Sequence, residues 1–179
     1  MSDMSMLING LKVSAENNAT FERRNPLDGT VATRAPAASP ADAILAVEAA
    51  AEAFKTWCDV GPNERRALLL KAADKLEAKT PEFIKAVPEE TGATGMWAGF
   101  NVFLAAGMIR EAAALTTQVA GEVIPSDVPG NLAMGIRQPA GVILGIAPWN
   151  APVILGVRAI ATPLACGNTG VQTAGWMRE

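Results

Sequence analysis

Acid–base or nucleophilic chemistry has few side chains to use in this sequence. The 179 residues include no His, no Tyr and two Cys, which are Cys58 and Cys166. Catalysis would therefore have to rely on a thiol, a Lys or a carboxylate. Free Cys is most often simply buried. We therefore interpret both thiols as packing residues.

Asn150 is the polar side chain best placed to bind an oxygen atom. It follows the apolar run Val142–Ala147, and its amide carries two N–H donors on a short stem. The end of a buried strand is where α/β folds place groups that face a ligand. Asn is also a good N-cap, so the residue could instead cap the helix expected after it. Residue type alone leaves both interpretations open.

The residues before 121 predict a β-rich opening followed by helices. Asn9-Gly10 favours a tight turn inside a hairpin at Leu7–Val13, and residues 21–24 and 31–35 read as extended. Four helices should follow, beginning near Ser39, Pro62, Thr80 and Met96, the last reaching Val119.

The first of these helices has a clear apolar period. Ile44, Val47, Ala51 and Phe54 recur at helical spacing and form one stripe. Such a stripe is the face that a helix normally packs against a core.

Downstream of residue 121 the pattern changes to strands. Leu132–Gln138 reads as a strand, and Val142–Ala147 as a second, more buried one. Residues 151–164 predict a helix closed by Gly167, and 169–173 a final strand. This order predicts a β-α-β unit, and hence an α/β fold.

Composition argues against two classes of partner. The net charge of −3 and pI near 5.1 leave no basic stripe for nucleic acid. The apolar segment 140–157 has nearly the length of a membrane span, but Pro148 and Pro152 interrupt it, so we expect no membrane segment. The N-terminus lacks a readable signal peptide, which favours a cytoplasmic protein.

Seven short motifs, in order and at consistent spacing, resemble the aldehyde dehydrogenase superfamily. The segment around Trp97–Val102 looks most like the salicylaldehyde and vanillin dehydrogenases of aromatic catabolism. The motifs are Leu7–Gly10, Asn25–Thr30, Glu64–Leu69, Glu89–Gly92, Gly121–Pro125, Gly145–Asn150 and Pro163–Thr169.

The resemblance implies a fold and a division of the chain. It implies an incomplete Rossmann-like cofactor domain with an N-terminal β-hairpin, a helical segment and one strand of an oligomerisation ribbon. Residues 1–121 would begin the cofactor domain, 122–140 would be the ribbon strand, and 141–179 would start the Rossmann-like sheet. Members of the family are expected to form homo-oligomers.

The resemblance also implies the chemistry. The family oxidises a small aldehyde, which the resemblance implies to be an aromatic one here, with NAD or NADP, of which NAD is slightly favoured. Asn150 matches the residue that donates an N–H to the oxyanion formed when a Cys attacks the aldehyde. Ile146, Ala147, Pro148 and Trp149 match positions that border the cofactor, although packing explains Ile146 and Ala147 equally well. No metal site is expected.

Several family features have no counterpart in this sequence. Thr173 stands where the family has a cofactor-binding Lys, and Trp176 where a Glu is often found. Neither Cys matches the nucleophile, and the general-base Glu is missing, so we expect the chain alone to be inactive. The tail from Gly170 resembles a frame change or premature stop. An alternative is a non-catalytic subunit that associates with a full-length dehydrogenase.

Overall fold

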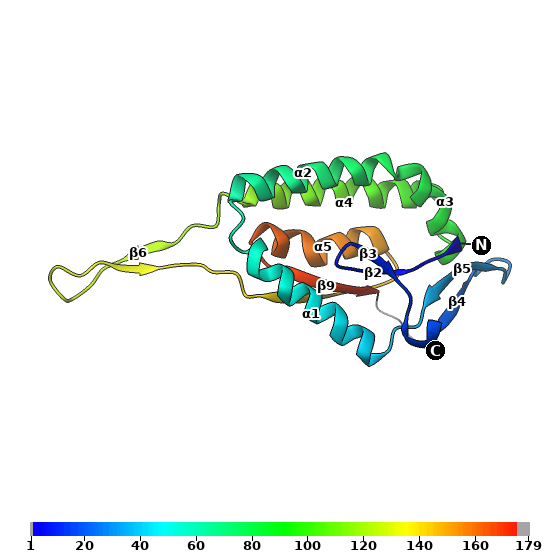
Figure 1. Ribbon diagram of the computed structural model, residues 1–179. Coiled ribbons are helices and arrows are strands. Elements are labelled where there is room, and N and C mark those ends of the chain that lie inside the picture. Colours follow the sequence, from blue (N-terminus) through cyan, green and yellow to red (C-terminus); the bar gives the residue numbers. More distant parts are fainter. Residues whose placement is uncertain (1, 175–179) are drawn as a thin grey trace.

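The computed structural model describes residues 2–174, which form helical layers around a two-stranded parallel sheet (Figure 1). The five helices are α1 (Pro40–Trp57), α2 (Pro62–Ala78), α3 (Thr80–Thr91), α4 (Gly95–Leu115) and α5 (Pro152–Ala165). The strands are β1 (Ser2–Asp3), β2 (Met6–Ile8), β3 (Leu11–Val13), β4 (Thr20–Arg24), β5 (Val31–Pro36), β6 (Glu122–Ile124), β7 (Ala133–Gly135), β8 (Val142–Ala147) and β9 (Thr169–Ala174).

The N-terminal strands form as the turn residues predict. β2 and β3 pair antiparallel around Asn9 and Gly10, whose φ angles of 50° and 75° suit a tight hairpin turn. β4 and β5 also pair antiparallel, and β1 adds to β5 in parallel. The predicted hairpin and extended segments are confirmed.

Helix α1 begins with the predicted cap. The Ser39 hydroxyl accepts a hydrogen bond from the Asp42 amide at 3.2 Å, and the Asp42 carboxylate accepts one from the Ser39 amide at 2.8 Å. A further amide, that of Glu16, donates to the same carboxylate at 3.0 Å. These backbone donors, that of Ser39 first, hold the pKa of Asp42 below its ordinary value.

The apolar stripe of α1 does not face the core. Ile44, Val47 and Ala51 are exposed, although a stripe of this kind normally packs against a core. α1 turns its alanines toward β9, and the Thr169 hydroxyl donates to the carbonyl of Ala50 at 2.7 Å. The small side chains of this face let the Thr169 hydroxyl reach the helix backbone, and they also border a cavity between α1 and β9.

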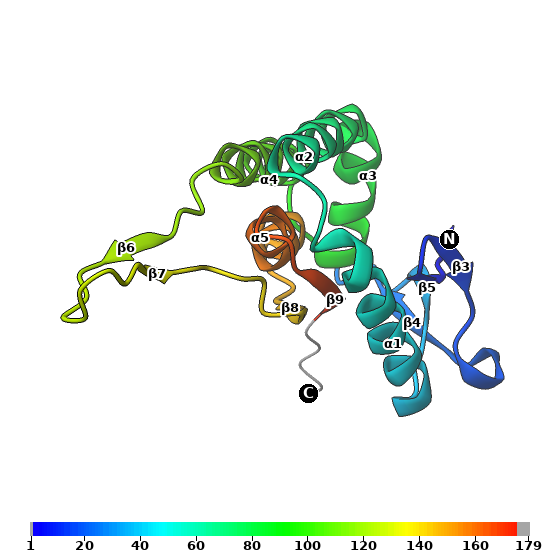
Figure 2. The ribbon, with the colours of Figure 1, turned by 60° about the vertical axis from the view of Figure 1, so that its left-hand side comes forward.

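A layer of α2 and α4 packs on α5 (Figure 2). The core cluster between these helices is largely built of alanines and includes Leu69, Ala73, Ala106, Ile109, Ala112, Ala113, Ala161 and Ala165. α4 is long and apolar enough to cross a membrane by length and composition alone. One of its faces is buried in this core, as in the core helix of a soluble protein.

Two neighbouring arginines of α2 bind the carboxyl ends of two other helices. Arg65 Nε donates to the carbonyl of Ala165 in α5 at 3.0 Å. Arg66 Nε donates to the carbonyl of Ala113 in α4 at 3.2 Å. Helix-terminal carbonyls lack partners within the helix and carry a partial negative charge, so cations are favoured there.

The contact of Arg66 with the Ala113 carbonyl also helps to end α4 earlier than predicted. The helix stops at Leu115 rather than continuing to Val119. Arg66 and the Thr116 hydroxyl, at 2.9 Å, both bind the Ala113 carbonyl, which a longer helix would use for its own hydrogen bond.

The predicted β-α-β unit is confirmed. β8 and β9 pair in parallel, with Val142 opposite Thr169 and Ala147 opposite Ala174, and α5 connects them. Asn168 ties the unit together: its carboxamide oxygen accepts from the Ala140 and Gly141 amides at 2.6 and 3.0 Å, and its Nδ2 donates to the Pro163 carbonyl at 3.1 Å.

The sequence predicted one ribbon strand at 122–140, and this number of strands is wrong. This segment holds two short strands, β6 and β7, which pair antiparallel as an arm that projects away from the helices (Figures 1 and 2). The loop from Pro125 to Asn131 reverses the chain, so the backbone groups of each strand find a partner within the arm.

Asn168→Ala should loosen the start of β8. Removing a hydrogen-bonding partner typically costs about 1–3 kcal/mol, so amide exchange at Ala140 and Gly141 should rise about tenfold or more. Hydrogen exchange with mass spectrometry would measure this. Asn131→Ala, in the exposed loop of the arm, is the matched control and should leave both amides unchanged. Exchange at the Ala140 and Gly141 amides that stays unchanged in the Asn168→Ala protein would contradict the role of Asn168.

The chain alone should associate in solution. Leu144 and Ile146 of β8 are 62% and 60% exposed, and Ile44 and Leu45 of α1 are also exposed. Large apolar faces of this kind promote association, so size-exclusion chromatography should show broad or high-mass species. A sharp monomer peak together with cooperative thermal melting would contradict this expectation.

Candidate functional site

The residues singled out from the sequence form one continuous segment at the carboxyl end of β8. Gly145 and Ala147 are buried against α5, and a Cβ at Gly145 would lie 3.0 Å from the Cβ of Ala159. Ile146, Pro148 and Trp149 are exposed, with Trp149 at 51%. Side chains of these three can therefore border a ligand, whereas Ala147 can contribute only through its backbone.

Asn150 is exposed and does not cap α5. The helix begins at Pro152 with Ala151 as its N-cap residue, and the Leu155 amide donates to the Ala151 carbonyl at 2.9 Å. Among the described residues, the Asn150 carboxamide forms no hydrogen bond, so the capping interpretation finds no support. Its two N–H groups are free to donate to a bound oxygen atom.

Trp97 of α4 contacts this segment, which sequence reasoning did not anticipate. Its indole Nε1 donates to the backbone carbonyl of Asn150 at 3.3 Å. Its ring stacks on Phe100 with centroids 5.5 Å apart and an interplanar angle of 26°. The contact joins residues 53 positions apart, so no local pattern could have found it.

An exposed apolar face of α4 begins beside this contact. Met96, Phe100 and Phe103 share one side of the helix at i, i+4 and i+7, and all three are exposed. Exposed aromatic groups that adjoin a polar donor suit a ligand with an aromatic ring. In the sequence, this surface could have been recognised from the three aromatic residues of one predicted helix, Trp97, Phe100 and Phe103.

One of the two residues expected to depart from the family pattern, Thr173, lies on β9, the strand next to β8. Thr173 of β9 lies opposite Ile146 in the parallel register and is exposed. A Lys at this position would have placed a cation beside the same strand end. Trp176, the second departure, lies outside the described residues.

Neither Cys has the surroundings of an activated nucleophile. The Cys58 thiol lies 3.8 Å from the Asp59 carboxylate, and Cys166 is the C-cap residue of α5. A thiolate is stabilised by a nearby cation or by the amino end of a helix. Cys58 instead lies beside a carboxylate, and Cys166 lies at the carboxyl end of a helix. Both residues are partly buried, which supports their interpretation as packing residues.

The strongest ion pairing lies away from the strand end. Arg110 of α4 donates to Glu77 at 2.7 Å and to Asp74 at 2.8 Å, both in α2. Hydrogen bonding to Glu77 raises the pKa of Arg110, and the same guanidinium lowers the pKa of Glu77. These charges join two helices, so we assign them a structural role.

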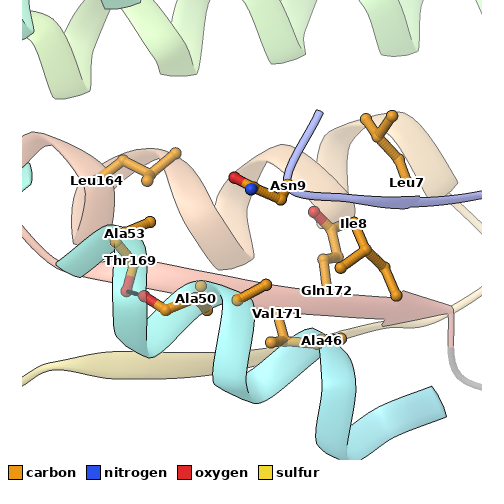
Figure 3. Close-up of a pocket in the computed structure, with 12 residues that line it drawn as sticks. Leu7, Ile8, Asn9, Ala46, Ala50, Ala53, Leu164, Thr169, Val171 and Gln172 are labelled. Atoms are coloured by element: carbon orange, nitrogen blue, oxygen red, sulfur yellow. Dashed lines mark hydrogen bonds between the residues drawn. The ribbon is translucent and has the colours of Figure 1, made fainter. Parts of the chain in front are cut away.

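A cavity of about 310 Å³ lies between α1, β9 and the β2–β3 hairpin, and Leu164 of α5 also lines it (Figure 3). Four alanines of α1 form one wall, and Asn9, Thr169 and Gln172 supply its polar side chains. None of the residues at the carboxyl end of β8 lines it. It holds no residue that the sequence had marked for chemistry, so we place the candidate site at the end of β8.

Comparison with known proteins agrees with the sequence motifs. The model of the aldehyde dehydrogenase family matches residues 13–173. A vanillin dehydrogenase from Pseudomonas sp. is 62% identical over 171 residues, which are 96% of this chain and 35% of that protein.

Solved structures show the same architecture. The salicylaldehyde dehydrogenase from Pseudomonas putida G7, complexed with salicylaldehyde, superposes with a TM-score of 0.92 at 50% identity, covering 96% of this chain and 35% of that one. An NAD-dependent benzaldehyde dehydrogenase from Corynebacterium glutamicum has a TM-score of 0.91 at 32% identity, with coverages of 96% and 38%.

The chain thus spans about a third of the length of the relatives it matches, and it corresponds to their N-terminal portion. The family match extends over most of the described residues, and the fold agrees along nearly the whole chain. The chain belongs to the aldehyde dehydrogenase family.

Proposed function

We propose that this chain supplies part of the active site of an enzyme that oxidises an aromatic aldehyde to the carboxylic acid with NAD or NADP. The observation that carries the proposal is the Asn150 carboxamide, which is exposed at the carboxyl end of β8 and makes no hydrogen bond to a described residue. A side chain left free in this way is suited to a ligand in α/β folds.

Asn150 would donate an N–H to the aldehyde oxygen. That oxygen gains negative charge when a nucleophile adds to the carbonyl carbon, and a fixed amide donor stabilises the charge without having to reorganise. The nucleophile and the general base must come from outside the present residues, because neither Cys58 nor Cys166 has an activating partner.

The exposed side chains of Ile146, Pro148 and Trp149 fit the border of a flat ring such as a nicotinamide. When bound, that cofactor accepts the hydride from the aldehyde carbon. Apolar neighbours would exclude water from the ring. The similar structures include an NAD-dependent benzaldehyde dehydrogenase and an NADP-dependent enzyme, which supports a nicotinamide cofactor of either kind.

An aromatic substrate is supported by two separate observations. The relatives act, by their names, on vanillin, salicylaldehyde and benzaldehyde. The exposed face of Met96, Phe100 and Phe103 begins next to Trp97, which contacts Asn150. A ring bound on this face would have its aldehyde group near the Asn150 amide.

The β6–β7 arm favours a role in assembly. Val123, Ile124 and Met134 are exposed on it, and β6 and β7 lie apart from the helices. We propose that the arm joins copies in a homo-oligomer. The same arm would serve the second candidate function, in which the chain is a non-catalytic subunit that associates with a full-length dehydrogenase.

The purified chain should show no aldehyde-dependent reduction of NAD or NADP. The reason is that no described residue supplies an activated nucleophile with a base. Absorbance at the reduced-nicotinamide band with vanillin, salicylaldehyde or benzaldehyde would measure it. Turnover that is blocked by alkylation of Cys58 or Cys166 would contradict this view.

Asn150→Ala should slow hydride transfer in an active chimera. The chimera joins residues 1–168 of this chain to the remainder of the Pseudomonas vanillin dehydrogenase, which is 62% identical over the matched region. Losing one oxyanion donor costs about 10²–10³ in rate. Pre-steady-state hydride transfer is the proper measurement, because a later step can limit turnover.

The melting temperature of this variant should change little, because the Asn150 side chain bonds no described residue. The matched control is Asn63→Ala at the exposed start of α2, away from both the site and the arm, which should keep both the rate and the melting temperature. An Asn150→Ala chimera with the normal rate of hydride transfer would show that the residue has no catalytic role.

A further inference from the structure

We propose that Trp97 is a positioning residue for Asn150, through the hydrogen bond from its indole N–H to the Asn150 carbonyl. The inference rests on the proposed role of Asn150 as a hydrogen-bond donor to the aldehyde oxygen. Trp97 would act by fixing the peptide that carries the Asn150 side chain.

The turn before α5 needs a partner from elsewhere in the fold. Pro148 and Pro152 have no N–H, and Ala151 at the N-cap has no side chain that could bind a helix amide. Within the described residues, no backbone hydrogen bond closes the segment 148–150 on itself. The indole of Trp97 is the group that binds the Asn150 carbonyl.

Trp97 is itself held firmly in α4. Its amide donates to the Thr94 hydroxyl, the cap of α4, at 3.1 Å, and its carbonyl accepts from Asn101 Nδ2 at 3.0 Å. Its ring stacks on Phe100. The indole N–H therefore has a defined direction, as a positioning group requires.

Asn101 adds independent support. It is fully buried, and its carboxamide oxygen has no partner among the described residues. Burial of a polar side chain with half its groups unpaired is unfavourable. Among the described residues, its side chain bonds only the main-chain carbonyl of Trp97, so this buried residue helps to hold the turn of α4 that carries the indole.

The consequence for catalysis is geometric. The carbonyl carbon and the Cβ of Asn150 are bonded to the same Cα, so a displacement of the backbone at Asn150 also moves the carboxamide. Misplacement of a reacting group by about 1 Å can cost about 10²-fold in rate. Losing the Trp97 donor should therefore slow the chemical step without removing the oxyanion donor.

Trp97→Phe in the chimera tests this, because Phe keeps a ring against Phe100 and loses the N–H. Hydride transfer at saturating aldehyde should fall by about 10- to 100-fold. The matched control is Trp57→Phe, which removes an indole bond of 3.2 Å to the Leu164 carbonyl at the other end of α5. It should lower the melting temperature and leave the hydride-transfer rate unchanged.

A double-mutant cycle separates positioning from direct contact with the substrate. If Trp97 acts through Asn150, Trp97→Phe should have no further effect in the Asn150→Ala chimera. An equal loss in both backgrounds would overturn the inference, as would a normal rate in the single variant. Phe100→Leu is the second variant, should Trp97→Phe not fold. It removes the ring on which the indole stacks and keeps the indole N–H. A normal rate of hydride transfer in this variant would also overturn the inference.

The two proposals fail in different ways. A normal rate for Asn150→Ala removes the proposed function of that residue, and the positioning role falls with it. A slow Asn150→Ala together with a normal Trp97→Phe leaves the proposed function intact and removes the positioning role alone.

Discussion

Hydrogen bonds hold α5 at both ends, and the one at its amino end fixes the turn that carries the candidate site. At its carboxyl end, Trp57 and Arg65 donate to the carbonyls of Leu164 and Ala165 at 3.2 and 3.0 Å. Before its amino end, Trp97 donates to Asn150. α1, α2 and α4 each supply one of these donors, so the position of α5 is set by three helices at once. Of these three hydrogen bonds, the Trp97 bond is the one that holds the turn between β8 and α5 directly.

Close packing makes these long-range hydrogen bonds possible. Ala98, Ala105, Ala106 and Ala113 of α4 are completely buried, and Gly145 of β8 lies against Ala159 of α5. Larger side chains at these positions would separate the layers and move the donors away from their carbonyls. The alanine-rich composition of the chain thus has a structural consequence, because it brings α4 within reach of Asn150.

Sequence reasoning succeeded where neighbouring residues decide the structure. The Asn9-Gly10 turn, the Ser39 cap and the strand at Val142–Ala147 all follow from local preferences, and each is observed. It failed where distant partners decide: the α1 stripe is exposed, and Arg66 helps to end α4 early. The motif containing Asn150 gave the candidate site, but the contact with Trp97 needed the fold.

A crystal structure of the chimera with an aromatic aldehyde bound tests the central claim most directly. We predict that the Asn150 amide nitrogen lies about 2.7–3.1 Å from the aldehyde oxygen, the distance of an oxyanion donor. The Trp97 indole should still bind the Asn150 carbonyl, and the ring of the aldehyde should lie on the Phe100 face of α4. An aldehyde oxygen bound elsewhere, with Asn150 turned toward the first turn of α5, would contradict the account.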